Sequence, residues 1–135
     1  MNIEINSSKS IENIQRSFNS AYPFLKLEFF TQAHDKGQAT AGKYMVNPKK
    51  LIGDYSKENI ASSLNVTDSM TVFELEKLFE SNYGLHVQVF RKSGRIWLET
   101  TATDDWTLQS QNEQGKELSE GSVEKDDLPD YHEQD

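Results

Sequence analysis

Hydrophobic residues recur at helical spacing in two separate stretches of the chain, residues 10–22 and 71–83. In each stretch they lie three or four residues apart, which is the spacing of one buried face of an amphipathic helix. The first face consists of Ile11, Ile14, Phe18 and Tyr22, and the second of Val72, Leu75, Phe79 and Tyr83. The pattern therefore predicts two helices that pack against a common core.

A hydrophobic residue at every second position follows each of these helices. The segments LKLEFF at 25–30 and LHVQVF at 85–90 alternate in this way, which is typical of strands with one buried face. Upstream of the helices, short alternating segments place Ile3 and Ile5 at the positions that Leu64 and Val66 occupy in the second copy. Each copy is therefore predicted to fold as strand, helix, strand.

The two copies align with each other at an offset of 61 residues, with identical Phe, Ser and Tyr residues in their helices. A repeated βαβ unit predicts an α+β fold, a ferredoxin-like two-layer sandwich with both helices on one face of an antiparallel sheet. The predicted organisation is one α+β domain over 1–108, made of repeat 1–30, insert 31–61, repeat 62–91 and an extra hairpin strand at 95–101.

The ends of the helices carry recognisable signals. Thr71 and Glu74 have the spacing of a capping box, whereas the first helix has Ser10 followed by Asn13 in place of the acid. A further strand is expected within the insert at 43–46. A last short helix is expected to begin at Thr103 or Asp104 and to end at Gly115.

The whole chain has a net charge of −8, and most of this negative charge lies in the last fifth of the chain. Residues 109–135 hold nine acidic residues and two lysines, while residues 1–108 hold 13 acidic and 12 basic residues. Residues 109–135 hold few large apolar side chains. Folding of this segment would therefore bury too little apolar surface to offset the conformational entropy that it would lose. We expect residues 109–135 to form a short helix or linker and then an acidic tail, disordered from about residue 115.

Residues that support catalysis are scarce. The chain has no cysteine, which excludes thiol chemistry and disulfides. Residues 37–43 fit the phosphate-loop spacing G-x-x-x-x-G-K, but Tyr44 stands where a magnesium-binding Ser or Thr is needed. His34, His86 and His132 lack metal-ligand spacing. We therefore expect no enzyme activity, no cofactor and no metal site.

The hairpin that ends the second repeat gathers positive charge at Arg91, Lys92 and Arg95, with Trp97 beside them. Arginine and aromatic residues are favoured at protein interfaces. The preferred interpretation is a small protein-interaction or regulatory module whose contact surface is this hairpin. The acidic tail is long enough to reach the hairpin, so it is also a candidate competitor for a partner.

Two alternatives remain open. The first is single-stranded nucleic-acid binding through Phe24, Phe30 and Phe90, which are expected on the sheet face away from the helices. Nucleic acid is nevertheless not expected as a partner, because residues 1–108 are almost neutral. The second alternative is a small-ligand regulatory domain with a cleft between the repeats. The absence of a signal-peptide pattern and of a long apolar run predicts a cytoplasmic protein without a membrane segment. The sequence does not indicate an oligomeric state.

Overall fold

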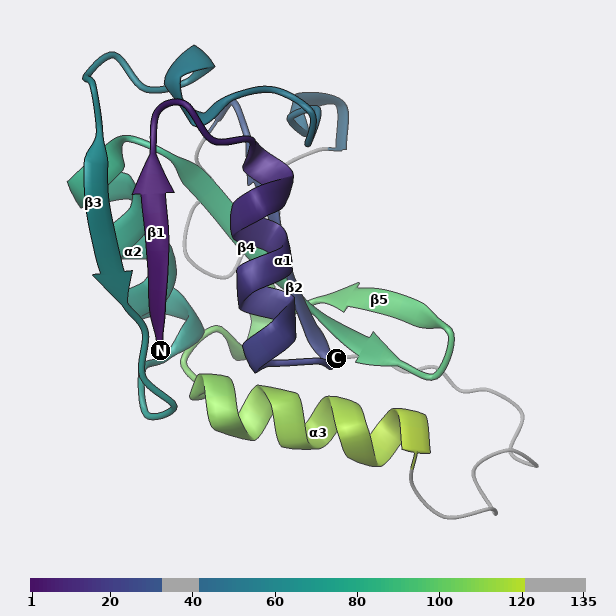
Figure 1. Cartoon of the computed structure of the whole chain (residues 1–135). Coiled ribbons are helices and arrows are strands. Elements are labelled where there is room, and N and C mark those ends of the chain that lie inside the picture. The colour runs from purple at the N-terminus through teal and green to yellow at the C-terminus, as the bar shows by residue number, and fades with distance from the viewer. Residues whose placement is uncertain (33–41, 121–135) are drawn as a thin grey trace.

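A computed structural model describes residues 1–32 and 42–120 of the chain. Within these ranges the protein is α+β, with three α-helices and five strands (Figure 1). In chain order the elements are β1 (Asn2–Asn6), α1 (Ile11–Ala21), β2 (Leu25–Phe30), β3 (Ala61–Asn65), α2 (Val72–Tyr83), β4 (His86–Ser93), β5 (Ile96–Glu99) and α3 (Leu108–Glu120).

The described strands form two small antiparallel sheets. β1 pairs with β3, and β2, β4 and β5 form a second sheet with β4 in the middle. A ferredoxin-like fold needs β1 to β4 in a single sheet, so that prediction is not confirmed. The second edge of β2 is bonded to the insert, since Val46 N–H donates to Phe29 O at 2.8 Å and Thr31 N–H donates to Tyr44 O at 2.9 Å. With this edge occupied, β3 pairs with β1 alone.

The strand pairing supports the internal repeat. Ile3 and Leu64 are equivalent in the alignment of the two copies, and they lie directly opposite each other between β1 and β3. Glu28 and Gln88 are also equivalent, and they lie directly opposite each other between β2 and β4. Two units related by a local twofold axis pair in this self-complementary way. Each βαβ unit thus contributes one strand to each sheet.

Both predicted helix faces and both predicted strand faces are confirmed in the core. The side chains at the helical positions and at alternate strand positions are buried together in one hydrophobic cluster. The rings of Phe29 and Phe79 meet edge to face, with centroids 5.7 Å apart, an arrangement that aromatic pairs favour. The core therefore lies where α1 and α2 meet β2 and β4.

The two repeats begin their helices differently. The capping box of α2 is confirmed: Glu74 N–H donates to Thr71 Oγ1 at 3.1 Å, and Thr71 N–H donates to Glu74 Oε1 at 2.9 Å. Ser10 makes no side-chain cap bond to α1. The N–H groups that open α1 bond instead to insert carbonyls, Ile11 to Lys50 and Glu12 to Pro48. The insert therefore replaces the cap that the sequence suggested.

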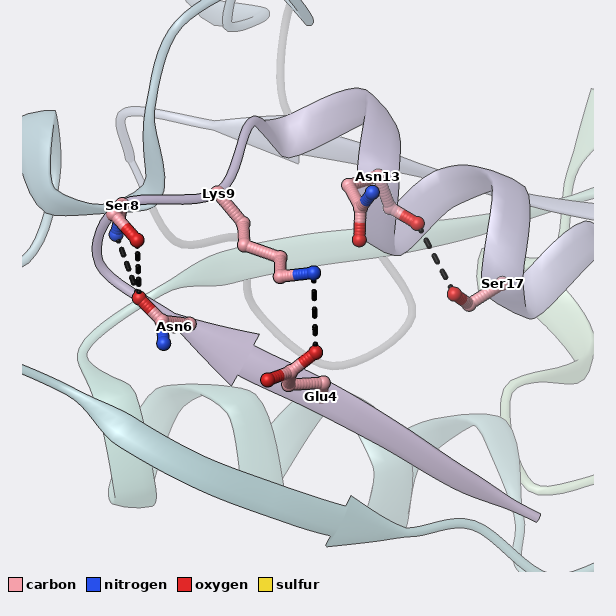
Figure 2. A network of polar contacts seen from close by, with 6 residues as sticks. All are labelled: Glu4, Asn6, Ser8, Lys9, Asn13 and Ser17. Atoms are coloured by element: carbon pink, nitrogen blue, oxygen red, sulfur yellow. Dashed lines mark hydrogen bonds and ion pairs between the residues drawn. The ribbon is translucent and has the colours of Figure 1, made fainter.

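The turn before α1 is held by short-range polar contacts (Figure 2). Asn6 Oδ1 accepts hydrogen bonds from the N–H and the hydroxyl of Ser8, at 2.9 and 2.7 Å. The ammonium of Lys9 lies 3.2 Å from Glu4 Oε1. These contacts join the end of β1 to the turn that leads into α1.

The insert forms less regular structure than the sequence predicted. The expected strand at 43–46 is wrong. A 3-10 turn covers Gly42–Tyr44, a single bridge joins Met45 to Phe30, and a second 3-10 turn covers Ile52–Asp54. Residues 44–46 are the only part of the described insert that bonds to β2 or to Thr31 beside it. The insert then continues to the start of α1, so no regular strand forms.

Both expected bounds of the last helix are also wrong, because α3 begins at Leu108 and continues to Glu120. The predicted disorder from residue 115 is therefore wrong for 115–120, while residues 121–135 lie outside the described residues. Helix α3 packs against β4 and β2, and Gly115 is buried where the two meet. Docking on the sheet, rather than composition, decides the length of this helix.

Candidate interaction surface on the hairpin

Side chains from β2, β4 and β5 meet on the sheet face away from the core. The register places Lys26 opposite Phe90 and Lys92 opposite Trp97. The ammonium of Lys26 lies 5.5 Å from the ring centroid of Phe90 and 5.0 Å from that of Trp97. We call these four residues together with Arg95, at the turn between β4 and β5, the hairpin surface.

Electrostatic contacts order the centre of the hairpin surface. Lys26 lies within the roughly 6 Å over which a cation interacts with an aromatic face, and its ammonium is 3.3 Å from Glu28 Oε2. Phe90 and Trp97 are both half-buried. A single cation thus lies near two aromatic rings, and each of these residues keeps part of its surface exposed to solvent.

The three predicted basic residues are not on one surface. Lys92 is half-buried and Arg95 is exposed, and neither forms an ion pair within the part of the chain that the structure describes. Arg91 is only 3% exposed. It points to the other face of the sheet, where its Nη1 donates to Gln111 Oε1 at 2.9 Å and its Cζ lies 5.7 Å from the ring centroid of Trp106. Arg91 therefore belongs to the contact with α3.

The three phenylalanines considered for nucleic-acid stacking are also separated. Phe30 is 5% exposed and is bridged to Met45 of the insert. Phe24 lies against Gly115 of α3. Phe90 alone belongs to the hairpin surface. These residues do not form one continuous exposed aromatic face.

Strand β5 borders the hairpin surface, and one of its edges has no strand partner within residues 1–32 and 42–120. Among the described strands, β5 pairs only with β4, and Ile96 at its start is 57% exposed. Unpaired N–H and C=O groups on such an edge can accept a further strand. The turn itself is anchored to α3, because Gly94 N–H donates to Ser119 Oγ at 3.1 Å. The hairpin is therefore fixed at its base and at its tip.

Features typical of other kinds of site are sparse in residues 1–32 and 42–120. No cluster of three or more potential metal ligands occurs there, and no helix in these ranges is long and apolar enough to cross a membrane. Gly37–Ala41 of the phosphate-loop-like segment lie outside the described residues, as do His34 and His132. A cavity of about 130 Å³ lies between the units, with Ile11, Phe30, Tyr55 and His86 in its lining.

No protein family model, curated protein or solved structure matches this chain. Of the sequence-predicted residues, Lys92 and Trp97 lie opposite each other on the hairpin surface, Arg95 follows in the adjoining turn, and Phe90 joins them there. Lys26 was missed as a contact residue. The alternation of residues 25–30 in the sequence places the Lys26 side chain on the outer face of the sheet. Only the pairing of β2 with β4 and of β4 with β5 brings it close to two aromatic rings.

Proposed function

We propose that this chain is a protein-interaction module that binds an extended acidic segment of another protein at the hairpin surface and the β5 edge. The observation that carries the proposal is the half-buried pair of aromatic rings, Phe90 and Trp97, beside β5, which pairs with β4 alone among the described strands. An extended segment would add its backbone to β5 and place alternate side chains over these rings.

The charges around the hairpin favour an acidic partner. Lys92 and Arg95 lack an ion pair within the described residues, whereas Lys26 already contacts Glu28. Charges at the rim of an interface act mainly on association rate and choice of partner. Affinity is expected to come instead from Trp97, since buried tryptophans dominate many interfaces.

The test is a selection of random extended peptides on the full-length chain, followed by binding measurements on the selected peptides. We expect selected peptides to be acidic with one or two apolar residues. Trp97→Ala should weaken their binding by ten- to thirtyfold, as removal of about 2 kcal/mol would. Lys92→Gln with Arg95→Gln should weaken binding less, and mainly at low salt.

The chain offers a matched control, because its other tryptophan, Trp106, lies on the opposite side of the sheet. Trp106 is 39% exposed, so Trp106→Ala should leave the affinity unchanged. Circular dichroism should show both variants to be folded. Selected peptides that bind equally well to the Trp97→Ala chain would contradict the proposal, and so would preferential binding of single-stranded nucleic acid at this surface.

A second candidate function, small-ligand binding, is supported by the cavity between the two units. Its volume of about 130 Å³ is close to the roughly 150 Å³ of an engineered cavity that binds benzene. Compounds of about six heavy atoms should then shift the amide resonances of Thr31 and His86. Val46→Leu should fill the cavity and abolish those shifts, and a fragment screen without any such shift would exclude this function.

A further inference from the structure

We propose that residues 121–135 of the same chain bind the hairpin surface and compete with an acidic partner there. This inference rests on the proposed function, because the tail would occupy the same site as the partner. By competing in this way, the C-terminal segment would regulate access of a partner to the hairpin surface.

The first argument is where the described helix ends. Ser119, in the last turn of α3, accepts a hydrogen bond from Gly94 N–H in the β4–β5 turn. Figure 1 shows α3 running below the hairpin toward that end. The end of α3 is therefore held at the β4–β5 turn, and a segment that continues from it needs no long linker to reach the hairpin surface.

The second argument is charge complementarity. Residues 121–135 hold six acidic residues and one lysine, whereas Lys92 and Arg95 carry positive charge at the hairpin. The tail also holds apolar side chains among its acids, at Val123, Leu128 and Tyr131. It thus has the same chemistry that the hairpin surface favours in a partner.

The third argument is reach and effective concentration. Fifteen residues extend to at most about 50 Å, which is more than enough to follow β5 from the tip of the hairpin. A tethered segment of this length competes at an effective concentration on the order of millimolar. Even a weak intramolecular contact then reduces the apparent affinity for a partner.

The experiment compares the wild-type chain with a full-length variant whose tail carboxylates are neutralised: Glu124→Gln, Asp126→Asn, Asp127→Asn, Asp130→Asn, Glu133→Gln and Asp135→Asn. We expect the amide resonances of residues 92–97 to differ between the two proteins at low salt and to converge at high salt. In the Lys92→Gln/Arg95→Gln background, neutralising the tail should cause no further change at these residues. Identical spectra of wild type and tail variant would overturn the inference.

A binding measurement separates this inference from the proposed function. An acidic peptide selected on the chain should bind the tail-neutralised variant about three- to tenfold more tightly than wild type. Equal affinities would overturn the inference while leaving the proposed function intact. If no selected peptide depends on Trp97 in either protein, the proposed function itself fails.

Discussion

Gly115 of α3 lies so close to Phe24 that a methyl group at this position would stand 2.8 Å from the Cβ of Phe24 and 3.1 Å from its carbonyl oxygen. Both atoms are at or beside the backbone, so they cannot move away as the end of a long side chain can. The missing side chain at residue 115 is therefore what allows α3 to pack on the sheet.

Gly115→Ala should destabilise the protein, although alanine is the better helix former by about 1 kcal/mol. Forcing a methyl group into a close contact costs about 1–3 kcal/mol, and the helix would have to shift away from β2. Urea denaturation followed by circular dichroism measures the change. Lys116→Ala, at the exposed neighbouring position, should change stability by less than about 0.5 kcal/mol. A gain in stability for Gly115→Ala would show that the contact relaxes without cost.

Gln111 links α3 to two other parts of the fold and is fully buried. Its Oε1 accepts from Arg91 Nη1 at 2.9 Å, and its Nε2 donates to the carbonyl of Thr103 at 2.8 Å. Gln111→Ala should cost at least about 2 kcal/mol, because it removes a partner from a buried charged group and from a carbonyl. Gln109→Ala, on the exposed side of the same helix, should have little effect in thermal unfolding. Equal losses for the two variants would argue against this polar contact.

The two helix starts should respond differently to the same substitution. Thr71→Ala removes the side-chain bond of the capping box, in which Thr71 Oγ1 accepts from Glu74 N–H, and should cost about 1 kcal/mol. Ser10→Ala, at the equivalent position of the first repeat, should change stability by less than about 0.5 kcal/mol, because insert carbonyls already accept from the first N–H groups of α1. Chemical denaturation of the two single variants tests the difference. Equal losses would mean that Ser10 caps α1 in solution.

Tyr22 should make the protein sensitive to alkaline pH. Burial, together with the hydrogen bond from Tyr22 Oη to Asp68 Oδ1 at 2.8 Å, raises the pKa of its phenol above the ordinary value of 10.0. The unfolded chain therefore loses this proton first, and stability falls as the pH rises above about 10, by up to about 1.4 kcal/mol per pH unit.

Tyr22→Phe should remove this part of the pH dependence between pH 9 and 11.5, measured by urea denaturation at each pH. Asp68→Asn should reduce it without abolishing it, because burial remains the larger cause of the raised pKa. An unchanged slope in Tyr22→Phe would assign the alkaline transition to other groups.

The sequence by itself determined the local elements of this protein. Helix faces, strand alternation, the Thr71–Glu74 capping box and the repeated βαβ unit depend on the spacing of nearby residues, and each can be recognised without knowing what packs against it. The sequence also proposes Lys92, Arg95 and Trp97 as interface residues, because charge and aromatic residues concentrate in one short hairpin, and that role stays a prediction.

Only the tertiary structure decided which strands pair and which charges remain exposed. The opposed Glu28 and Gln88 belong to different repeats, and nothing local specifies that β2 should meet β4 while the insert bonds to its other edge. Arg91 and Lys92 are neighbours in sequence, yet alternation along β4 sends one beneath α3 and the other to the hairpin surface. Helix α3 itself continues past Gly115 because it docks on the sheet. These outcomes depend on contacts between residues far apart in the chain. A local sequence pattern does not show how much free energy such contacts contribute.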